Sequence, residues 1–491
     1  MKPRLLKVAI LAAGQGMRMK SSLPKVLHPV AGRPMVGYVL DAARALGPER
    51  VVVVVGYQAE KVETYLGDSV TYVRQEPQLG TGHALLMAMA ALGADEADLL
   101  LLYGDIPLVR SETLRRLLDH HRATGATASI LTAVLEAPTG YGRIVRDPGS
   151  GRVQRIVEEA DATLEEQAIR EVNTGIYCFK VPEVLPLLDR LTVANRQKEL
   201  YLVDLIAIMA GQGDLVEALV ARDPGEVEGV NSRSQLARAE ARCRAGILDA
   251  LMGSGVTVVD PASTYVDWGV EIGPDTVLEP GCVLRGRTRI GRDCVIGPWS
   301  HLVDTVVADG CRVWASVVEA SELERGASVG PFSRLRAGTR VGQEARVGNF
   351  AELKNTAVGR GAKVPHHSYV GDTDIGAEAN IGAGVVVVNY DGLNKHRTRI
   401  GDAAFVGCNT NLIAPVEVGD GAYTAAGSTV TLDVPPGSLA VARSGQRNLE
   451  GWVDRRRPGT RAAQAARQAR ERASGSPGPS ADKGSQERTE E

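Results

Sequence analysis

The sequence predicts a Rossmann-like α/β domain with a mostly parallel sheet, then a linking helix, then a left-handed parallel β-helix of hexapeptide repeats. Two observations support this fold class. Short β-branched runs alternate with amphipathic stretches in the first half, and aliphatic residues recur at steps of six in the second. We therefore divide the chain into four parts, which are residues 1–231, a linker at 232–252, residues 253–443, and a largely disordered tail at 444–491.

The first part has the alternation that is typical of a sheet covered by helices. Amphipathic stretches such as Met35–Leu46 and Ser111–His121 separate apolar runs that predict strands. Those runs are Lys7–Ala12, Val51–Val55, Thr71–Arg74, Leu99–Tyr103, Thr127–Val134 and Thr174–Phe179. Ligands of such sheets bind at the carboxyl ends of the strands, so we expect a site there.

The third part has a six-residue period that no single helix or strand has. A coil with three flat faces has this period, with one aliphatic residue per face pointing inward. The aliphatic columns are Val266, Ile272, Leu278, Leu284, Ile290, Ile296 and Leu302, then Val329, Leu335, Val341, Val347 and Leu353, then Ile400, Val406, Leu412 and Val418. A solenoid alone does not establish an enzyme. Polar and basic residues interrupt the repeat at Val387–Ile400, which predicts an external loop, and we expect disorder beyond Trp452.

Composition excludes several classes of protein. Hydrophobic residues make up 44% and charged residues 23%, which excludes collagen-like and mostly disordered chains. A net charge of -3 argues against a nucleic-acid partner. The apolar run Val8–Ala13 is too short for a signal peptide, and no apolar stretch of about 20 residues occurs, so we expect a cytoplasmic protein with no membrane partner. The six cysteines form no CxxC pair, which argues against a zinc site.

A glycine-rich turn directly follows the first predicted strand. Gly14 and Gly16, with Arg18 and Lys25 close behind, could bring backbone N–H groups and positive charge to a polyphosphate. The spacing is neither that of a Walker A loop nor that of a dinucleotide fingerprint. Asp105, at the end of Leu99–Tyr103, could hold Mg²⁺ against triphosphate oxygens or simply cap the next turn.

A second group of polar residues interrupts the solenoid. Acetylation of an amine needs a base, which favours a histidine such as His366, and Arg336 and Lys354 could bind a phosphate. A lone histidine on such a coil is usually a surface residue. Asn380 and the polar pair Asn389-Tyr390 lie within the same few coils, however, and favour a site.

The N-terminal motif LAAGxGxRM…PK resembles that of sugar-1-phosphate nucleotidyltransferases. The runs Gln78–His83, Gly140–Arg143, Glu171–Gly175 and Gly229–Asn231 follow in the order that this family uses. Over about residues 5–455 the chain resembles the bacterial N-acetylglucosamine-1-phosphate uridyltransferase/glucosamine-1-phosphate N-acetyltransferase family. The resemblance implies a bifunctional cytoplasmic enzyme with Mg²⁺ as cofactor. It would acetylate glucosamine-1-phosphate with acetyl-CoA, transfer UMP from UTP, and form a homotrimer whose acetyl sites are shared between subunits.

The resemblance also implies roles for single residues of the first site. Those at the nucleotide phosphates, uracil, ribose and metal are Leu11, Ala12, Ala13, Gly14, Arg18, Lys25, Gln75, Gly80, Thr81, Tyr103, Gly104 and Asp105. Those that hold the sugar are Gly142, Glu158 and Asn173, while Asn231 shares the Mg²⁺ with Asp105. Ala160 stands where the family pattern has Lys.

For the second site the resemblance implies His366 as general base. The acceptor contacts would be Arg336, Lys354, Tyr369 and Asn380, and Lys395 belongs to the external loop. Residues on the acetyl-CoA side would be Ala383, Asn389, Tyr390, Cys408, Ala426 and Arg443. Cys408 stands where better-known members carry Ser.

Two other hypotheses compete with a bifunctional enzyme. One is a monofunctional sugar-1-phosphate nucleotidyltransferase whose solenoid only oligomerises it, and His366 with Asn389-Tyr390 argues against it. The other is a non-catalytic scaffold, which should lack Asp105, Lys25 or the glycine loop, whereas all are present.

Overall fold

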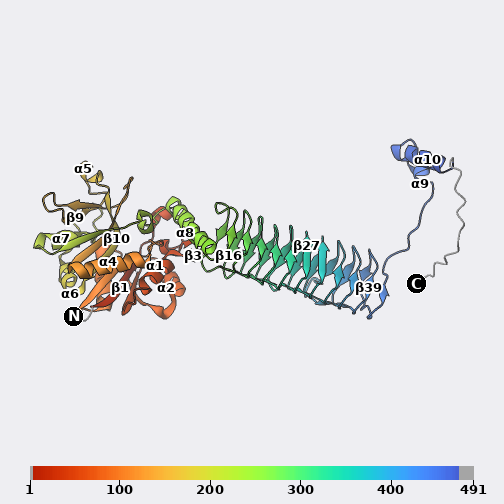
Figure 1. The fold of residues 1–491 in the computed structure, drawn as a ribbon, viewed down its shortest axis with the longest axis horizontal. Helices are drawn as coiled ribbons and strands as arrows, with labels where there is room; N and C mark the ends of the chain where they lie inside the picture. The colour runs from red at the N-terminus through yellow and green to blue at the C-terminus, as the bar shows by residue number, and fades with distance from the viewer. Residues whose placement is uncertain (1–3, 475–491) are drawn as a thin grey trace.

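The computed structural model describes residues 4–474 and shows an elongated molecule (Figure 1). An α/β domain lies at one end. The long helix α8 (Arg233–Gly253) leads from it into a solenoid of short strands that runs along the molecule, and two small helices lie beyond the far end. No helix in the described part is long and apolar enough to cross a membrane.

The N-terminal domain is built on a mixed sheet with strand order β11-β7-β10-β6-β1-β4-β5, and β8 and β9 form a side ribbon on β10. The strands are β1 (Leu5–Ala12), β4 (Arg50–Val55), β5 (Thr71–Arg74), β6 (Ala97–Tyr103), β7 (Ala128–Val134), β8 (Arg143–Arg146), β9 (Val153–Val157), β10 (Glu171–Lys180) and β11 (Val216–Val220). β10 runs antiparallel to β6 and β7, and the other main pairings are parallel. The mostly parallel Rossmann-like sheet is thus confirmed.

Helices cover both faces of this sheet, because alternate residues of a strand point to opposite sides. In β1, Ala9 and Leu11 belong to one hydrophobic core, whereas Val8 and Ile10 belong to the other. The helices are α1 (Met35–Arg44), α2 (Ala59–Leu66), α3 (Thr81–Leu92), α4 (Ser111–Thr124), α5 (Leu164–Gln167), α6 (Val181–Val184) and α7 (Asp204–Gln212).

From Thr257 to Ala440 the chain winds as a left-handed β-helix with three faces, which we call the prism. The first face begins with β12 (Thr257–Val258) and ends with β41 (Leu439–Ala440), the second runs from β13 (Tyr265–Val266) to β40 (Thr429–Val430), and the third runs from β14 (Glu271–Ile272) to β38 (Val416–Val418). The strand pairs along each face are parallel. The strands that carry the argument below are β13 (Tyr265–Val266), β25 (Arg334–Arg336), β27 (Arg346–Asn349), β28 (Glu352–Lys354), β30 (Lys363–His366), β31 (Tyr369–Gly371), β33 (Asn380–Ile381), β34 (Val386–Val388) and β35 (Thr398–Ile400).

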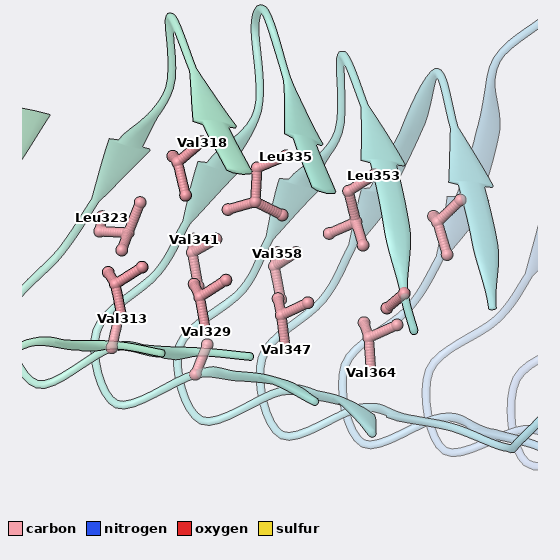
Figure 2. Packing of buried hydrophobic residues seen from close by; sticks show 14 of the residues in the cluster. Val313, Val318, Leu323, Val329, Leu335, Val341, Val347, Leu353, Val358 and Val364 are labelled. Atoms are coloured by element: carbon pink, nitrogen blue, oxygen red, sulfur yellow. The ribbon is translucent and has the colours of Figure 1, made fainter. Parts of the chain in front are cut away.

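The prism is held together by one inward aliphatic residue per face and per coil (Figure 2). Val347, Leu353 and Val358 fill one coil, and the equivalent residues of neighbouring coils stack on them. Leu353 is fully buried, so its truncation to Ala would cost roughly 2–5 kcal/mol of stability. The predicted columns at steps of six are therefore the core of the prism.

Two segments depart from the regular coil. Residues 389–397 leave the prism between β34 and β35 as an external loop, inside which Tyr390 and Lys395 form an isolated bridge. Beyond the prism, α9 (Trp452–Arg456) and α10 (Arg461–Ser474) form where disorder was expected. Alanine, arginine and glutamine in this stretch favour a helix, and Asp454 joins the two helices through Arg470 at 2.5 Å. Residues 475–491 of the predicted tail lie outside the described residues.

The α/β domain is joined to the first coil of the prism by aromatic and backbone contacts. The Arg33 guanidinium lies 4.0 Å from the ring centroid of Trp268 and 5.0 Å from that of Tyr38. The Trp268 backbone N–H donates to the Ala31 carbonyl at 2.8 Å, and Glu240 of α8 accepts from the Ala31 N–H at 2.5 Å. The turn around Ala31 is thus bound to both the prism and the linking helix.

Candidate active sites

A cavity of about 300 Å³ opens at the carboxyl ends of β1 and β6. The turn after β1 forms one wall, and the start of α3 forms another. The residues that line it are Leu11, Ala12, Ala13, Gly14, Lys25, Val26, Gln75, Gln78, Gly80, Thr81, Ala84, Tyr103, Asp105 and Glu199. Gly16 has φ +72°, and a Cβ there would lie 2.6 Å from Lys25 Cβ, so this position needs glycine for Lys25 to approach the turn.

A second cavity, of about 180 Å³, adjoins the first and shares Lys25, Tyr103 and Asp105 with it. Its other lining residues are Ile106, Gly140, Tyr141, Gly142, Glu158, Asn173, Thr174, Gly175, Gly229 and Asn231. Burial, and then the nearby carboxylates of Asp161 and Asp204, raise the pKa of Glu158. The two cavities form one bipartite site with a charged centre between its halves.

That centre joins three segments that are far apart in the sequence. Lys25 Nζ lies 2.5 Å from Asp105 Oδ2 and 3.0 Å from Asn231 Oδ1. The Asp105 backbone is held in place as well, because its carbonyl accepts from the Val230 N–H at 2.9 Å. One carboxylate oxygen and one amide oxygen therefore converge on a single point that a positive charge occupies.

The structure brings together nearly all the residues predicted for this site. Two of them do not line either cavity. Gly104 lies behind the wall, where its N–H donates to the Leu11 carbonyl at 2.9 Å. Arg18 is exposed in the short 3₁₀ helix Met17–Met19 and is absent from both linings. Glu199 lines the larger cavity but follows no motif, so only the folded chain could have identified it.

The polar residues of the prism divide between two of its edges. The edge between the first and second faces, which we call the histidine edge, carries one residue of each coil in a single column. Backbone N–H groups link successive coils there, because His367 donates to Asn349 at 3.1 Å and Asn409 to Ala383 at 2.8 Å. The column contains Asn349, His366, Ala383, Cys408 and Ala426, and Arg443 lies beside Gly427 at its end.

The other group lies along the edge between the second and third faces, which we call the loop edge. Arg336 pairs with Lys354 in the strand register, and Lys354 Nζ lies 3.7 Å from Asp372 Oδ2. Asn389 and Asn355 donate to Asp372 at 2.5 and 2.7 Å. Burial opposes ionisation, but these hydrogen bonds and the charges of Lys354 and Lys395 hold the pKa of Asp372 below its usual value.

Lys395 returns from the external loop to this edge. The nearby ammonium group of Lys354 lowers the pKa of Lys395. Two lysines thus lie near the Asp372 carboxylate, and Arg336 beside them pairs with Glu352 at 3.1 Å. Asp372 was not singled out in the sequence, although its place one residue after β31 puts it in register with Asn355 and Asn389.

The two remaining predicted residues lie on faces rather than on edges. Tyr369 is on the second face, in register with Glu352 and Val386, and Asn380 is on the first face, in register with Lys363. Within one chain, the predicted acceptor and acetyl-CoA residues are therefore distributed over two edges and two faces of the prism.

Comparisons with known proteins agree with this two-part description. The MobA-like NTP transferase domain matches residues 8–174, and the bacterial transferase hexapeptide (six repeats) matches residues 269–303. Fold and sites together define a transferase in which a nucleotidyltransferase domain precedes a hexapeptide-repeat transferase domain.

Similarity to curated proteins extends over both domains. The Bifunctional protein GlmU of Geobacillus sp. (strain WCH70) is 49% identical over 446 residues, which cover 91% of this chain and 97% of that protein. The Bifunctional protein GlmU of Streptomyces avermitilis is 49% identical over 463 residues, which cover 94% of this chain and 96% of that protein. The chain belongs to the family of bifunctional GlmU proteins.

Proposed function

We propose that this chain catalyses two consecutive reactions, one in each domain. Residues 253–443 acetylate glucosamine-1-phosphate with acetyl-CoA, and residues 1–231 transfer UMP from UTP to the resulting N-acetylglucosamine-1-phosphate, with release of pyrophosphate. The observation that supports this most strongly is the similarity to bifunctional relatives, at 49% identity over 91% of the chain, which includes both candidate sites. A monofunctional nucleotidyltransferase is not favoured, because these relatives are named bifunctional.

In the uridyl reaction the larger cavity takes the nucleotide and the smaller one takes the sugar. Leu11–Gly14 present backbone N–H groups to the phosphates, while Gln75, Gly80 and Thr81 lie where they can contact the uracil. Gly142, Glu158 and Asn173 line the sugar side. The sugar phosphate attacks the α-phosphorus in line, so positioning and charge neutralisation suffice without a nucleophilic side chain.

The charged centre between the cavities fits a Mg²⁺ ion. Mg²⁺ takes hard oxygen ligands and is usually bound by one or two protein groups together with phosphate oxygens and water. Asp105 and Asn231 supply two such oxygens, and among residues 4–474 no group of three or more His, Cys, Asp or Glu side chains is placed to hold a metal ion. Bound there, Mg²⁺ would neutralise charge on the triphosphate. Lys25, which contacts both ligands, would then turn its ammonium group toward the phosphates.

In the acetyl reaction His366 accepts a proton from the amine as its nitrogen attacks the thioester carbonyl. The new C–N bond forms, the C–S bond breaks, and coenzyme A leaves as a thiolate that takes up a proton. Arg336 and Lys354 supply positive charge for the acceptor phosphate, and Tyr369 and Asn380 are the other residues proposed to contact the acceptor. Ala383, Cys408 and Ala426 keep the edge beyond His366 free of bulky side chains, which suits an extended acyl donor.

We propose a homotrimer as the functional state. Large apolar side chains stay exposed along the histidine edge before His366, with Trp299 71%, Phe332 61% and Phe350 52% exposed. Asn389, Tyr390 and Lys395 belong to the other edge of the second face. Side-by-side prisms in a closed ring would cover the aromatic residues and bring the loop edge of one copy to the histidine edge of the next.

A cytoplasmic location completes the proposal, because all three substrates are multiply charged and do not cross a bilayer unaided. Product analysis tests the proposed function directly. The protein is incubated with glucosamine-1-phosphate, acetyl-CoA, UTP and Mg²⁺, with each omitted in turn. UDP-N-acetylglucosamine should require all four, and free N-acetylglucosamine-1-phosphate should accumulate without UTP. The proposal would be contradicted if, without acetyl-CoA, the protein formed a UDP-sugar from glucosamine-1-phosphate as fast as it forms UDP-N-acetylglucosamine in the complete mixture.

A further inference from the structure

The dipeptide Asn349-Phe350 lies directly beside His366-His367 on the next coil of the histidine edge. Asn349 pairs with His366 in the strand register, and the His367 N–H donates to the Asn349 carbonyl at 3.1 Å. The Asn349 side-chain oxygen Oδ1 meets His366 Nδ1. The Phe350 and His367 rings stack with their centroids 5.0 Å apart. Each residue of one pair therefore contacts its counterpart in the other.

The contact between Asn349 and His366 selects one tautomer of the imidazole. An amide oxygen only accepts hydrogen bonds, so His366 Nδ1 must carry the proton and donate it. Nε2 then keeps its lone pair and is the ring nitrogen able to accept a proton. With the opposite tautomer, the imidazole would offer an N–H to the substrate amine and could not act as a base.

The contact between Phe350 and His367 holds the second histidine ring against the preceding coil. Phe332, Phe350 and His367 all have left-handed φ angles, of 59°, 57° and 48°. Such angles are costly for bulky side chains and persist only when the surroundings hold them. The same left-handed turn recurs along this edge at Ala315 and Asn409, so the repeat itself provides it. The aromatic stack adds a packing contact, because the Phe332 and Phe350 ring centroids lie 5.4 Å apart and Phe350 lies on His367. His367 is therefore engaged in packing, and its neighbour His366 is left to face the substrate.

We propose that Asn349 is the positioning residue of the acetyl reaction, which sets the tautomer and direction of the His366 ring, while the stack on Phe350 engages the neighbouring His367 ring in packing. This inference rests on the proposed role of His366. It assigns to the coil before the base a function that neither the repeat pattern nor the polar motifs indicate.

The test compares two substitutions at one position in the full-length protein. Asn349→Leu removes the acceptor at nearly constant volume, and acetyl kcat should fall about 10–100-fold, as for loss of outer groups that orient an imidazole. The KM values for both substrates should change less than about threefold, because binding groups stay in place. Asn349→Asp keeps an acceptor for Nδ1–H and should retain kcat within about tenfold. Gln343→Ala, an amide at another corner of the same coil, is the matched control and should behave as the wild type.

Additional variants separate the failure of this inference from that of the proposed function. Asn349→Leu combined with His366→Ala should be no slower than His366→Ala alone, since a positioning residue acts only through the base. Full activity of Asn349→Leu, or equal losses in Asn349→Leu and Asn349→Asp, would overturn the inference while leaving the base assignment intact. If His366→Ala itself kept full acetyl activity, the proposed base would be wrong, and the role of Asn349 would be wrong with it.

Discussion

The two candidate sites are assembled in opposite ways. The charged centre of the α/β domain joins Lys25 to Asp105 and Asn231, which lie 80 and 206 residues away in the chain. The histidine edge is a single column with one residue per coil, so neighbours in space are one turn of the prism apart. A site of the first kind depends on the whole domain fold. A site of the second kind can be changed one coil at a time, and coupling is expected between residues of adjacent coils, such as Asn349 and His366.

The largest effect expected is that of Asp105→Ala. Loss of the carboxylate removes the proposed metal ligand and leaves Lys25 without its main partner, so pyrophosphate release should fall by about three orders of magnitude or more. Acetylation of glucosamine-1-phosphate should stay within about twofold of the wild type, because that site lies on the prism. Both rates are measured on the same preparation. Equal loss of the two activities in a folded protein would show that the sites are not independent.

His366→Ala should have the next largest effect. Loss of a general base typically lowers the rate about 10²–10⁴-fold, and we expect acetyl transfer to fall by that order with substrate binding much less affected. Uridyl transfer from supplied N-acetylglucosamine-1-phosphate should be unchanged. His367→Ala should be mild by comparison, since that ring packs on Phe350. A crippling His367→Ala with a mild His366→Ala would reverse the assignment of the two histidines.

A pH dependence of stability should distinguish the domains. His121 is 1% exposed, and burial lowers its pKa below the usual 6.5 although the Asp98 carboxylate opposes the shift. The fold thus favours the neutral ring, whose stabilising effect is complete above pH 6.5 and is lost as the pH falls below it. One proton contributes a slope of at most about 1.4 kcal/mol per pH unit.

Calorimetry between pH 7.5 and 4.5 measures this dependence. The transition of the α/β domain should move to lower temperature in acid, and His121→Gln should show a flatter slope over the same range. The His121 hypothesis fails if that variant and the wild type lose stability in parallel.

The smallest effect is expected at the C-terminus. In Figure 1 α9 and α10 lie away from the prism, and the predicted site residue nearest to them is Arg443. Removal of all residues after Arg456 should therefore leave both activities within about twofold of the full-length rates. A folded truncation that had lost only acetyl transfer would show that this segment completes the second site.

The contrast between the repeating prism and the α/β domain also explains which features could be predicted from the sequence. The core of the prism could be predicted from spacing alone, because every coil places an aliphatic residue inward at each sixth position. Leu335, Val341 and Leu353 all follow this spacing. The antiparallel direction of β10 could not be predicted from its apolar pattern, since a buried strand has the same pattern whether it pairs in parallel or antiparallel. The helices after Trp452 were missed because an Arg- and Ser-rich composition resembles that of solvated tails, although its alanines favour a helix. Asn349 and Asp372 were missed because their contacts are with residues of the adjacent coil, which the sequence alone does not show.

The junction around Ala31 affects how far apart the two candidate sites lie within one chain. Arg33, Trp268 and Tyr38 fix the α/β domain to the first coil, and six coil steps along the second face separate β13 from β31. At about 4.8 Å per step, this amounts to roughly 30 Å of stiff ladder that no hinge can shorten. On the proposed assignment, an acetylated sugar phosphate would have to travel at least this far to reach the α/β domain of the same chain. The covalent link therefore keeps the two sites in one molecule without bringing them into contact within the chain.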